Sequence, residues 1–187
     1  LTLNDFVFIR ADWGTVDIDG TKITSWDENA GGPDTQYTLY GRAHIQVKSR
    51  MGTDGVTVRE SRMDIRNSDI GYLGYAGPEA YGLSWKVLGG MFDSVGVFGD
   101  VVDNKIHDNY FGIYTYGAEA MTFLNNEVYQ NILYGIDPHD DSDYLIIDGN
   151  YVHHNGSHGI ICSQRCNNLT ITNNTSTNNT GNGLMLH

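Results

Sequence analysis

The chain has 187 residues, a mass of 20.7 kDa and a formal net charge of −12 at pH 7. This length suits one domain with a sizeable core, so we treat residues 1–187 as a single domain. The negative charge argues against a nucleic-acid-binding protein, and the sequence holds no apolar run of the roughly 18 residues that a membrane-spanning helix needs. The abrupt start at Leu1 and the apolar end at Leu184–His187 are those expected of a fragment of a longer chain.

Residues 1–100 contain short alternations of apolar and polar side chains, which predict strands. These alternations fall at residues 16–18, 45–47, 56–59 and 62–65. Nine of the eleven Lys and Arg residues lie in this half, whereas six of the seven His residues lie in the other. A groove that crosses both halves would therefore be locally basic in spite of the net charge.

Residues 101–187 contain four copies of one repeat, in which an Asn, a second Asn and a Gly recur in phase. The first Asn recurs at spacings of 22, 24 and 24 residues. The members are Asn104, Asn126, Asn150 and Asn174, then Asn109, Asn131, Asn155 and Asn179, and then Gly112, Gly135, Gly159 and Gly183. An aliphatic residue follows each Gly, and others flank each first Asn. The pattern predicts an all-β fold, a right-handed parallel β-helix of roughly eight coils.

Each repeat is then one coil of short strands, stacked about 4.8 Å from the next. We expect Ile113, Ile136 and Ile160 to form one interior column. Asn is expected at corners because it tolerates the left-handed conformation and can hydrogen-bond to its own copy in the next coil. Gly is expected where a Cβ atom would clash.

One coil departs from the repeat. It reads Tyr134-Gly135-Ile136-Asp137-Pro138-His139-Asp140. Strand alternation turns Ile136 inward and places Asp137 and His139 on the outer face. Stacking predicts three neighbour pairs: Tyr114 beside Asp137, Tyr116 beside His139, and His158 beside Tyr134. An acid, an imidazole and a phenol within about one coil spacing form an acid–base constellation.

Simpler interpretations of these residues remain open. Asp-Pro-His can form a turn, and His153 and His154 are expected to be solvated corner residues. Four acidic residues of the same region form either a solvated turn or a Ca²⁺ site, namely Asp137, Asp140, Asp141 and Asp143. Cys162 and Cys166 are close enough in sequence for a disulfide across a tight corner, and a pair of free thiols is the alternative.

The motif of residues 134–140 resembles the signature of the mannuronan (alginate) C5-epimerases, a family with a right-handed parallel β-helix. The resemblance covers about residues 111–187. It implies conversion of β-D-mannuronate to α-L-guluronate within alginate, through removal of the C-5 proton and its return on the other face. It implies acid–base roles for Tyr134 and His139, and binding or neutralisation of the substrate carboxylate by Asp137. His158 is the fourth catalytic candidate, as the expected partner of Tyr134.

A polyanionic substrate needs cationic and aromatic groups beside this coil. Our candidates for substrate binding are Tyr114, Tyr116, Arg165 and Lys86. We also expect basic residues of the first half, such as Lys86, Arg59 or Arg62, to extend the groove.

The resemblance requires no cofactor, with Ca²⁺ as an alternative, and it implies a periplasmic, extracellular or cell-wall location. The predicted partner is an anionic polysaccharide, with no nucleic acid and no membrane span. Two other functions stay open: an alginate lyase, which would expel the C-4 oxygen after the same proton removal, and a non-catalytic carbohydrate-binding β-helix. A pectinase-like hydrolase is disfavoured, because only Asp137 clearly projects from a strand.

Overall fold

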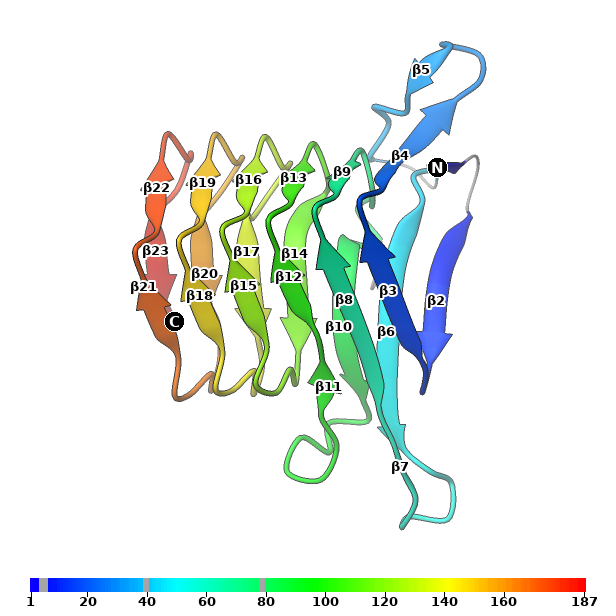
Figure 1. The fold of residues 1–187 in the computed structure, drawn as a ribbon, viewed down its shortest axis with the longest axis vertical. Coiled ribbons are helices and arrows are strands. Elements are labelled where there is room, and N and C mark those ends of the chain that lie inside the picture. The colour runs from blue at the N-terminus through cyan, green and yellow to red at the C-terminus, as the bar shows by residue number, and fades with distance from the viewer. Residues whose placement is uncertain (4–6, 39–40, 78–79) are drawn as a thin grey trace.

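The computed structural model describes residues 1–3, 7–38, 41–77 and 80–187, and it confirms the parallel β-helix. Its coils lie side by side from the N-terminal end to the C-terminal end (Figure 1). Over these described ranges the strands form three parallel sheets and no segment is helical, so none is a helix that could cross a membrane.

We name the sheets A, B and C. Sheet A consists of β1 (Thr2–Leu3), β4 (Lys22–Asp27), β9 (Asp69–Gly71), β13 (Lys105–His107), β16 (Glu127–Tyr129), β19 (Tyr151–His153) and β22 (Thr175–Thr177), with β5 (Gly32–Pro33) antiparallel to β4. Sheet B consists of β2 (Phe8–Asp12), β6 (His44–Met51), β10 (Gly82–Leu88), β14 (Phe111–Tyr116), β17 (Ile136–His139), β20 (Ile160–Cys162) and β23 (Leu184–Leu186), with β7 (Val58–Arg59) antiparallel to β6. Sheet C consists of β3 (Thr15–Asp19), β8 (Ser61–Arg66), β11 (Val97–Phe98), β12 (Asp100–Val102), β15 (Thr122–Leu124), β18 (Ile146–Asp148) and β21 (Thr170–Thr172).

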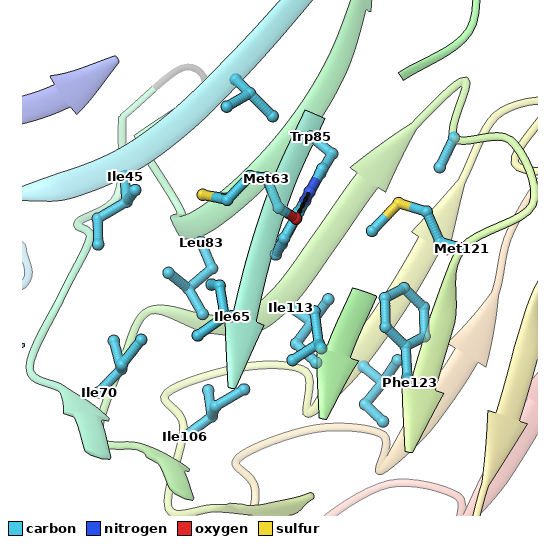
Figure 2. Close-up of a cluster of buried hydrophobic side chains, with 14 of the residues drawn as sticks. Ile45, Met63, Ile65, Ile70, Leu83, Trp85, Ile106, Ile113, Met121 and Phe123 are labelled. Carbon is cyan, nitrogen blue, oxygen red and sulfur yellow. Dashed lines mark hydrogen bonds between the residues drawn. The ribbon is translucent and has the colours of Figure 1, made fainter. Parts of the chain in front are cut away.

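The core is a set of aliphatic columns that run along the axis of the β-helix. In sheet B, Ile113 pairs with Ile136 and Ile136 with Ile160, and all three are buried, as predicted. Larger side chains also fill this core, among them Trp85, which donates its indole N–H to the carbonyl of Met63 (Figure 2). Burying these columns stabilises the solenoid, because each coil covers the apolar face of its neighbour.

Two ladders of buried Asn side chains join the C-terminal coils. In one, Asn126 Nδ2 donates to Asn150 Oδ1 at 3.0 Å, and in the other, Asn131 Nδ2 donates to Asn155 Oδ1 at 2.9 Å. These contacts confirm the predicted hydrogen bonds between equivalent Asn side chains of successive coils. The expected corner conformation is wrong for the ladder Asn residues, because the residue before each of them takes the positive φ. These residues are Asp103, Asp108, Asn125, Gln130, Gly149, His154, Asn173 and Asn178. The ladder Asn therefore serves the buried backbone, and its predecessor makes the corner.

The repeated Gly has the predicted steric cause. A Cβ atom on Gly135 would lie 2.6 Å from the carbonyl oxygen of Gly159 and 2.6 Å from Cγ1 of Val152. Both contacts are too short for a methyl group, so the coils can approach at this position only without a side chain.

The substitution Asn131→Ala should lower the free energy of unfolding by roughly 2–5 kcal/mol, since each buried polar group that loses its partner costs about 1–3 kcal/mol. The Asn131 side chain accepts from the N–H of Asn109 and donates to Asn155 Oδ1. Urea denaturation measures the loss, and Asn29→Ala, at an exposed hairpin position, is the matched control. Equal losses in the two variants would show that the ladder does not contribute.

Candidate active site

Strand β17 places the two central residues of the motif on the outer face of sheet B. In the register between β14 and β17, Tyr114 pairs with Asp137 and Tyr116 pairs with His139, as predicted. The ring centroids of Tyr116 and His139 are 6.3 Å apart and nearly parallel, and the Tyr114 ring lies 5.8 Å from His139. The imidazole of His139 therefore lies against the phenol rings of Tyr114 and Tyr116.

Asp137 is on the outer face but is covered, with only 1% of its surface exposed. Its projection from the outer face of the strand is as predicted, but neighbouring side chains cover it. Its Oδ1 atom is buried without a hydrogen-bond partner in the described residues. Burial raises the pKa of this carboxyl to about 8, because an ionised group is poorly solvated there. Asp137 is thus a protonated carboxyl at neutral pH.

Tyr114 is also buried, beside Asp137. Burial, followed by the nearby carboxyl of Asp137, raises the pKa of Tyr114 far above its usual value. Its phenol therefore keeps its proton and can donate a hydrogen bond at any physiological pH.

The turn after β17 holds the His139 ring. Asp140 and Asp141 both have positive φ, of 26° and 52°, a conformation that Asp tolerates better than most residues. The turn brings Asp140 Oδ2 to 3.1 Å from His139 Nδ1. Arg165 Nη2 donates to Asp140 Oδ1 at 3.1 Å and to Asp141 Oδ2 at 2.8 Å. A chain of contacts thus runs from Arg165 through Asp140 to His139.

The same contacts involve one substrate-binding candidate and three of the calcium candidates. Arg165, a substrate-binding candidate, forms ion pairs with two carboxylates of the chain itself. Asp140 and Asp141 are thus paired with this guanidinium, and Asp143 accepts from the N–H of Asn167. No cluster of three or more His, Cys, Asp or Glu side chains suited to a metal ion occurs in the ranges that the structure describes.

Tyr134 and His158 stack at the other end of the strand, as predicted. Their ring centroids are 5.7 Å apart and the planes differ by 3°. His158 Nδ1 accepts the backbone N–H of Asn182 at 2.8 Å, so the neutral ring carries its proton on Nε2. The Phe111 and Tyr134 rings also form a T-shaped contact, with centroids 5.1 Å apart. Tyr134 is therefore held by rings from the coils on both sides.

The basic residues of the first half divide between two sheets. Lys86 pairs in register with Tyr116, and its Nζ lies 4.9 Å from the centre of that ring, so it extends the outer face of sheet B beside the motif, as predicted. Arg59 lies farther along the same sheet, beside Trp13. The prediction for Arg62 is wrong: it lies in β8 of sheet C, where it forms ion pairs with Asp64 and Asp100.

Cys162 and Cys166 are free thiols rather than a disulfide. Cys166 donates to the carbonyl of Ser163. Burial raises the pKa of Cys162 to about 12 and that of Cys166 to about 11, so neither thiol is ionised at neutral pH.

His154 lies at a corner of sheet A, as predicted, with a φ of 55°. The prediction of a solvated corner is wrong for His153, which ends strand β19 and has a side chain only 12% exposed. The His153 ring stacks on Tyr129 with centroids 5.2 Å apart. Asp140 is the residue that the sequence interpretation undervalued, because it considered this side chain only as part of a solvated turn or a calcium site. Its position next to His139 was the available signal.

Comparisons with known proteins agree with this geometry. Residues 46–187 match the family model described as a right handed beta helix region. The chain is 32% identical over 171 residues to a mannuronan C5-epimerase of Pseudomonas fluorescens, an alignment that covers 89% of this chain and 31% of that protein. It is 31% identical over 166 residues to the mannuronan C5-epimerase AlgG of Azotobacter vinelandii, with 86% of this chain and 30% of that protein covered.

A solved structure shows the same fold. The crystal structure of a double mutant of the periplasmic alginate epimerase AlgG superposes with a TM-score of 0.84 at 28% identity, over 96% of this chain and 41% of that chain. The chain thus spans about a third of the length of the curated relatives that it matches. It belongs to the right-handed β-helix family, and within that family its similarity is to the mannuronan C5-epimerases.

Proposed function

We propose that this chain carries the site of an alginate epimerase, which converts β-D-mannuronate to α-L-guluronate units within the polymer. Two lines of support meet at β17. The similarity is to mannuronan C5-epimerases, and the coil that departs from the repeat carries the titratable groups that C-5 chemistry needs. The C-5 proton is weakly acidic, so the reaction needs a base, an acid and neutralisation of the adjacent carboxylate.

The observation that carries the proposal is the contact between His139 and Asp140. A hydrogen bond from Nδ1–H to the Asp140 carboxylate leaves the lone pair of Nε2 available. In this role Nε2 takes the C-5 proton, while the ion pair with Arg165 holds the Asp140 carboxylate in position. Asp140 is a positioning residue, because it acts through the imidazole.

The electron pair left at C-5 spreads into the substrate carboxyl group, so that group must be neutralised or hydrogen-bonded. The protonated carboxyl of Asp137 and the phenol of Tyr114 are donors for it, and both lie beside His139. Donors that are already oriented stabilise developing charge without reorganisation. Lys86 and Tyr116 would bind the neighbouring sugar units of the polysaccharide.

Tyr134 returns a proton to the opposite face of C-5 in this proposal. Its O–H is the source of that proton, and the parallel stacking with His158 holds the ring in place. One turnover leaves His139 protonated and Tyr134 ionised, and proton exchange with solvent restores both. The overall reaction is therefore balanced without a cofactor or a metal ion.

The proposed partner is an anionic polysaccharide, and the proposed location is the periplasm or the cell exterior, where such polymers are found. The structural relative AlgG is described as periplasmic.

The test is proton NMR of polymannuronate incubated with the protein, in which epimerisation produces the anomeric signal of guluronate. An unsaturated uronate, detected by its ultraviolet absorbance, would instead identify a lyase. Binding of the polymer with neither product would identify a non-catalytic carbohydrate-binding protein.

A further inference from the structure

The outer face of sheet B continues from the active site toward the N-terminal coils. Paired residues form one column that runs from His139 through Tyr116, Lys86 and Lys48 to Asp12. With about 4.8 Å between neighbouring strands, Lys48 lies roughly 14 Å from His139 along this column. A polymer that lies across the active site in this direction must pass over the N-terminal coils.

A cavity of about 200 Å³ opens at the far end of the column, in the area of β2, β6 and β10. It is lined by Arg10, Asp12, Trp13, Lys48, Arg50 and Leu88. Three of these side chains are cationic, and the single carboxylate, Asp12, is paired with Arg10 at 3.0 Å. Cationic side chains therefore outnumber carboxylates in this lining, although the chain has a net charge of −12.

Backbone hydrogen bonds and turn conformations hold the residues around the cavity in place. The N–H of Trp13 donates to the carbonyl of Lys48 at 3.1 Å, and Trp13 has a φ of 49°. The hairpin of β6 and β7 pairs Arg50 with Arg59, and both guanidiniums lie on the Trp13 ring, at 4.5 and 4.8 Å from its centre. Cation–π contacts of this kind hold two like charges close together.

Arg50 supplies the observation that points to a ligand. Its Nε atom is buried and has no hydrogen-bond partner in the described residues. A buried donor without an acceptor is rare in proteins, and it is costly unless a ligand satisfies it. A guanidinium pairs best with a carboxylate, which can accept two parallel hydrogen bonds.

We propose that the cluster of Trp13, Arg50 and Arg59 is a distal subsite that binds a carboxylate of the polyuronate chain. It would hold a sugar roughly three units from the one that reacts, because a 1,4-linked pyranose is about as long as one strand spacing. This inference rests on the proposed function. It adds that affinity depends on chain length, and that this contact acts equally on bound substrate and transition state.

Arg50→Gln should raise KM for polymannuronate about 10-fold or more and leave kcat unchanged, since a hydrogen bond to a charged group is worth about a factor of ten or more. The same variant should lose the preference for long oligomannuronates over a trimer that cannot span both sites. Arg66→Gln is the matched control, because it removes the same charge from sheet C, where Arg66 pairs with Asp17. Arg50→Lys keeps the charge and should still weaken binding, which separates the paired hydrogen bonds from charge alone.

Calorimetric titration with polymannuronate tests the subsite independently of catalysis. If the wild-type protein binds the polymer but forms no guluronate, the proposed function fails, and the subsite is still supported by weaker binding of the Arg50→Gln variant. If Arg50→Gln and Arg66→Gln, both folded by circular dichroism, bind every chain length as the wild type does, the subsite is overturned.

Discussion

His139→Ala should lower the rate of C-5 epimerisation of polymannuronate by about 10²- to 10⁴-fold, the usual cost of losing a positioned base. The ring lies on the outer face, where it contacts Tyr116 and Asp140 rather than the interior columns. The variant should therefore keep the fold and the melting temperature. NMR quantification of guluronate against time measures the effect.

Two further variants serve as comparisons for His139→Ala. His154→Asn removes an imidazole from a corner of sheet A, where Asn also tolerates the positive φ, and it should keep full activity. Tyr134→Phe removes only the hydroxyl and should also abolish epimerisation, while the stacking with His158 keeps the ring in place. Near-normal turnover by His139→Ala would exclude this imidazole as the base.

Asp137→Asn should be more stable than the wild type at neutral pH, and the difference should vanish near pH 4. The folded-state pKa of Asp137 is about 8 and its ordinary value is 3.8. The unfolded chain therefore releases this proton first, and wild-type stability falls as the pH rises from about 4 to about 8. A tenfold difference in proton affinity between the folded and unfolded chains corresponds to about 1.4 kcal/mol, so the total loss is on the order of several kcal/mol. Asn is neutral at every pH and avoids this penalty.

Urea denaturation of both proteins between pH 4 and pH 8 measures the difference. Asp103→Asn, at an exposed corner, is the control and should show no such trend. Parallel stability curves for wild type and Asp137→Asn would contradict the raised pKa. In activity, Asp137→Asn should retain more epimerisation than Asp137→Ala, since only Asn keeps a hydrogen-bond donor for the substrate carboxylate. Equal activities of Asn and Ala would rule out that donor role.

Most of the fold could be predicted from the repeat, because the physical causes of the repeat are local and periodic. Ile113, Ile136 and Ile160 recur in phase because an interior column needs one apolar residue per coil. Gly135 recurs because the backbone of the next coil leaves no room for a Cβ atom. The same register predicted the pairs of Tyr116 with His139 and of Tyr134 with His158, since stacked coils keep a constant spacing.

The irregular first half was less predictable. Arg59 and Arg62 are three positions apart, yet the hairpin of β6 and β7 leaves Arg59 on sheet B, and the chain then enters sheet C before Arg62. The place where a chain turns from one sheet to the next depends on contacts with other coils, so neither alternation nor charge could reveal it.

By itself, the sequence determined the β-helix, the register of its C-terminal coils and the coil that carries Tyr134, Asp137 and His139. Periodicity specifies which residues face inward and which coils are neighbours, because one residue in each turn must fill the same column. Only the tertiary structure decided that Asp137 is buried and protonated, that Arg165 holds Asp140, and that Arg50 meets Trp13. Those properties depend on burial and on turn conformations between coils about two dozen residues apart, and a linear pattern does not encode either.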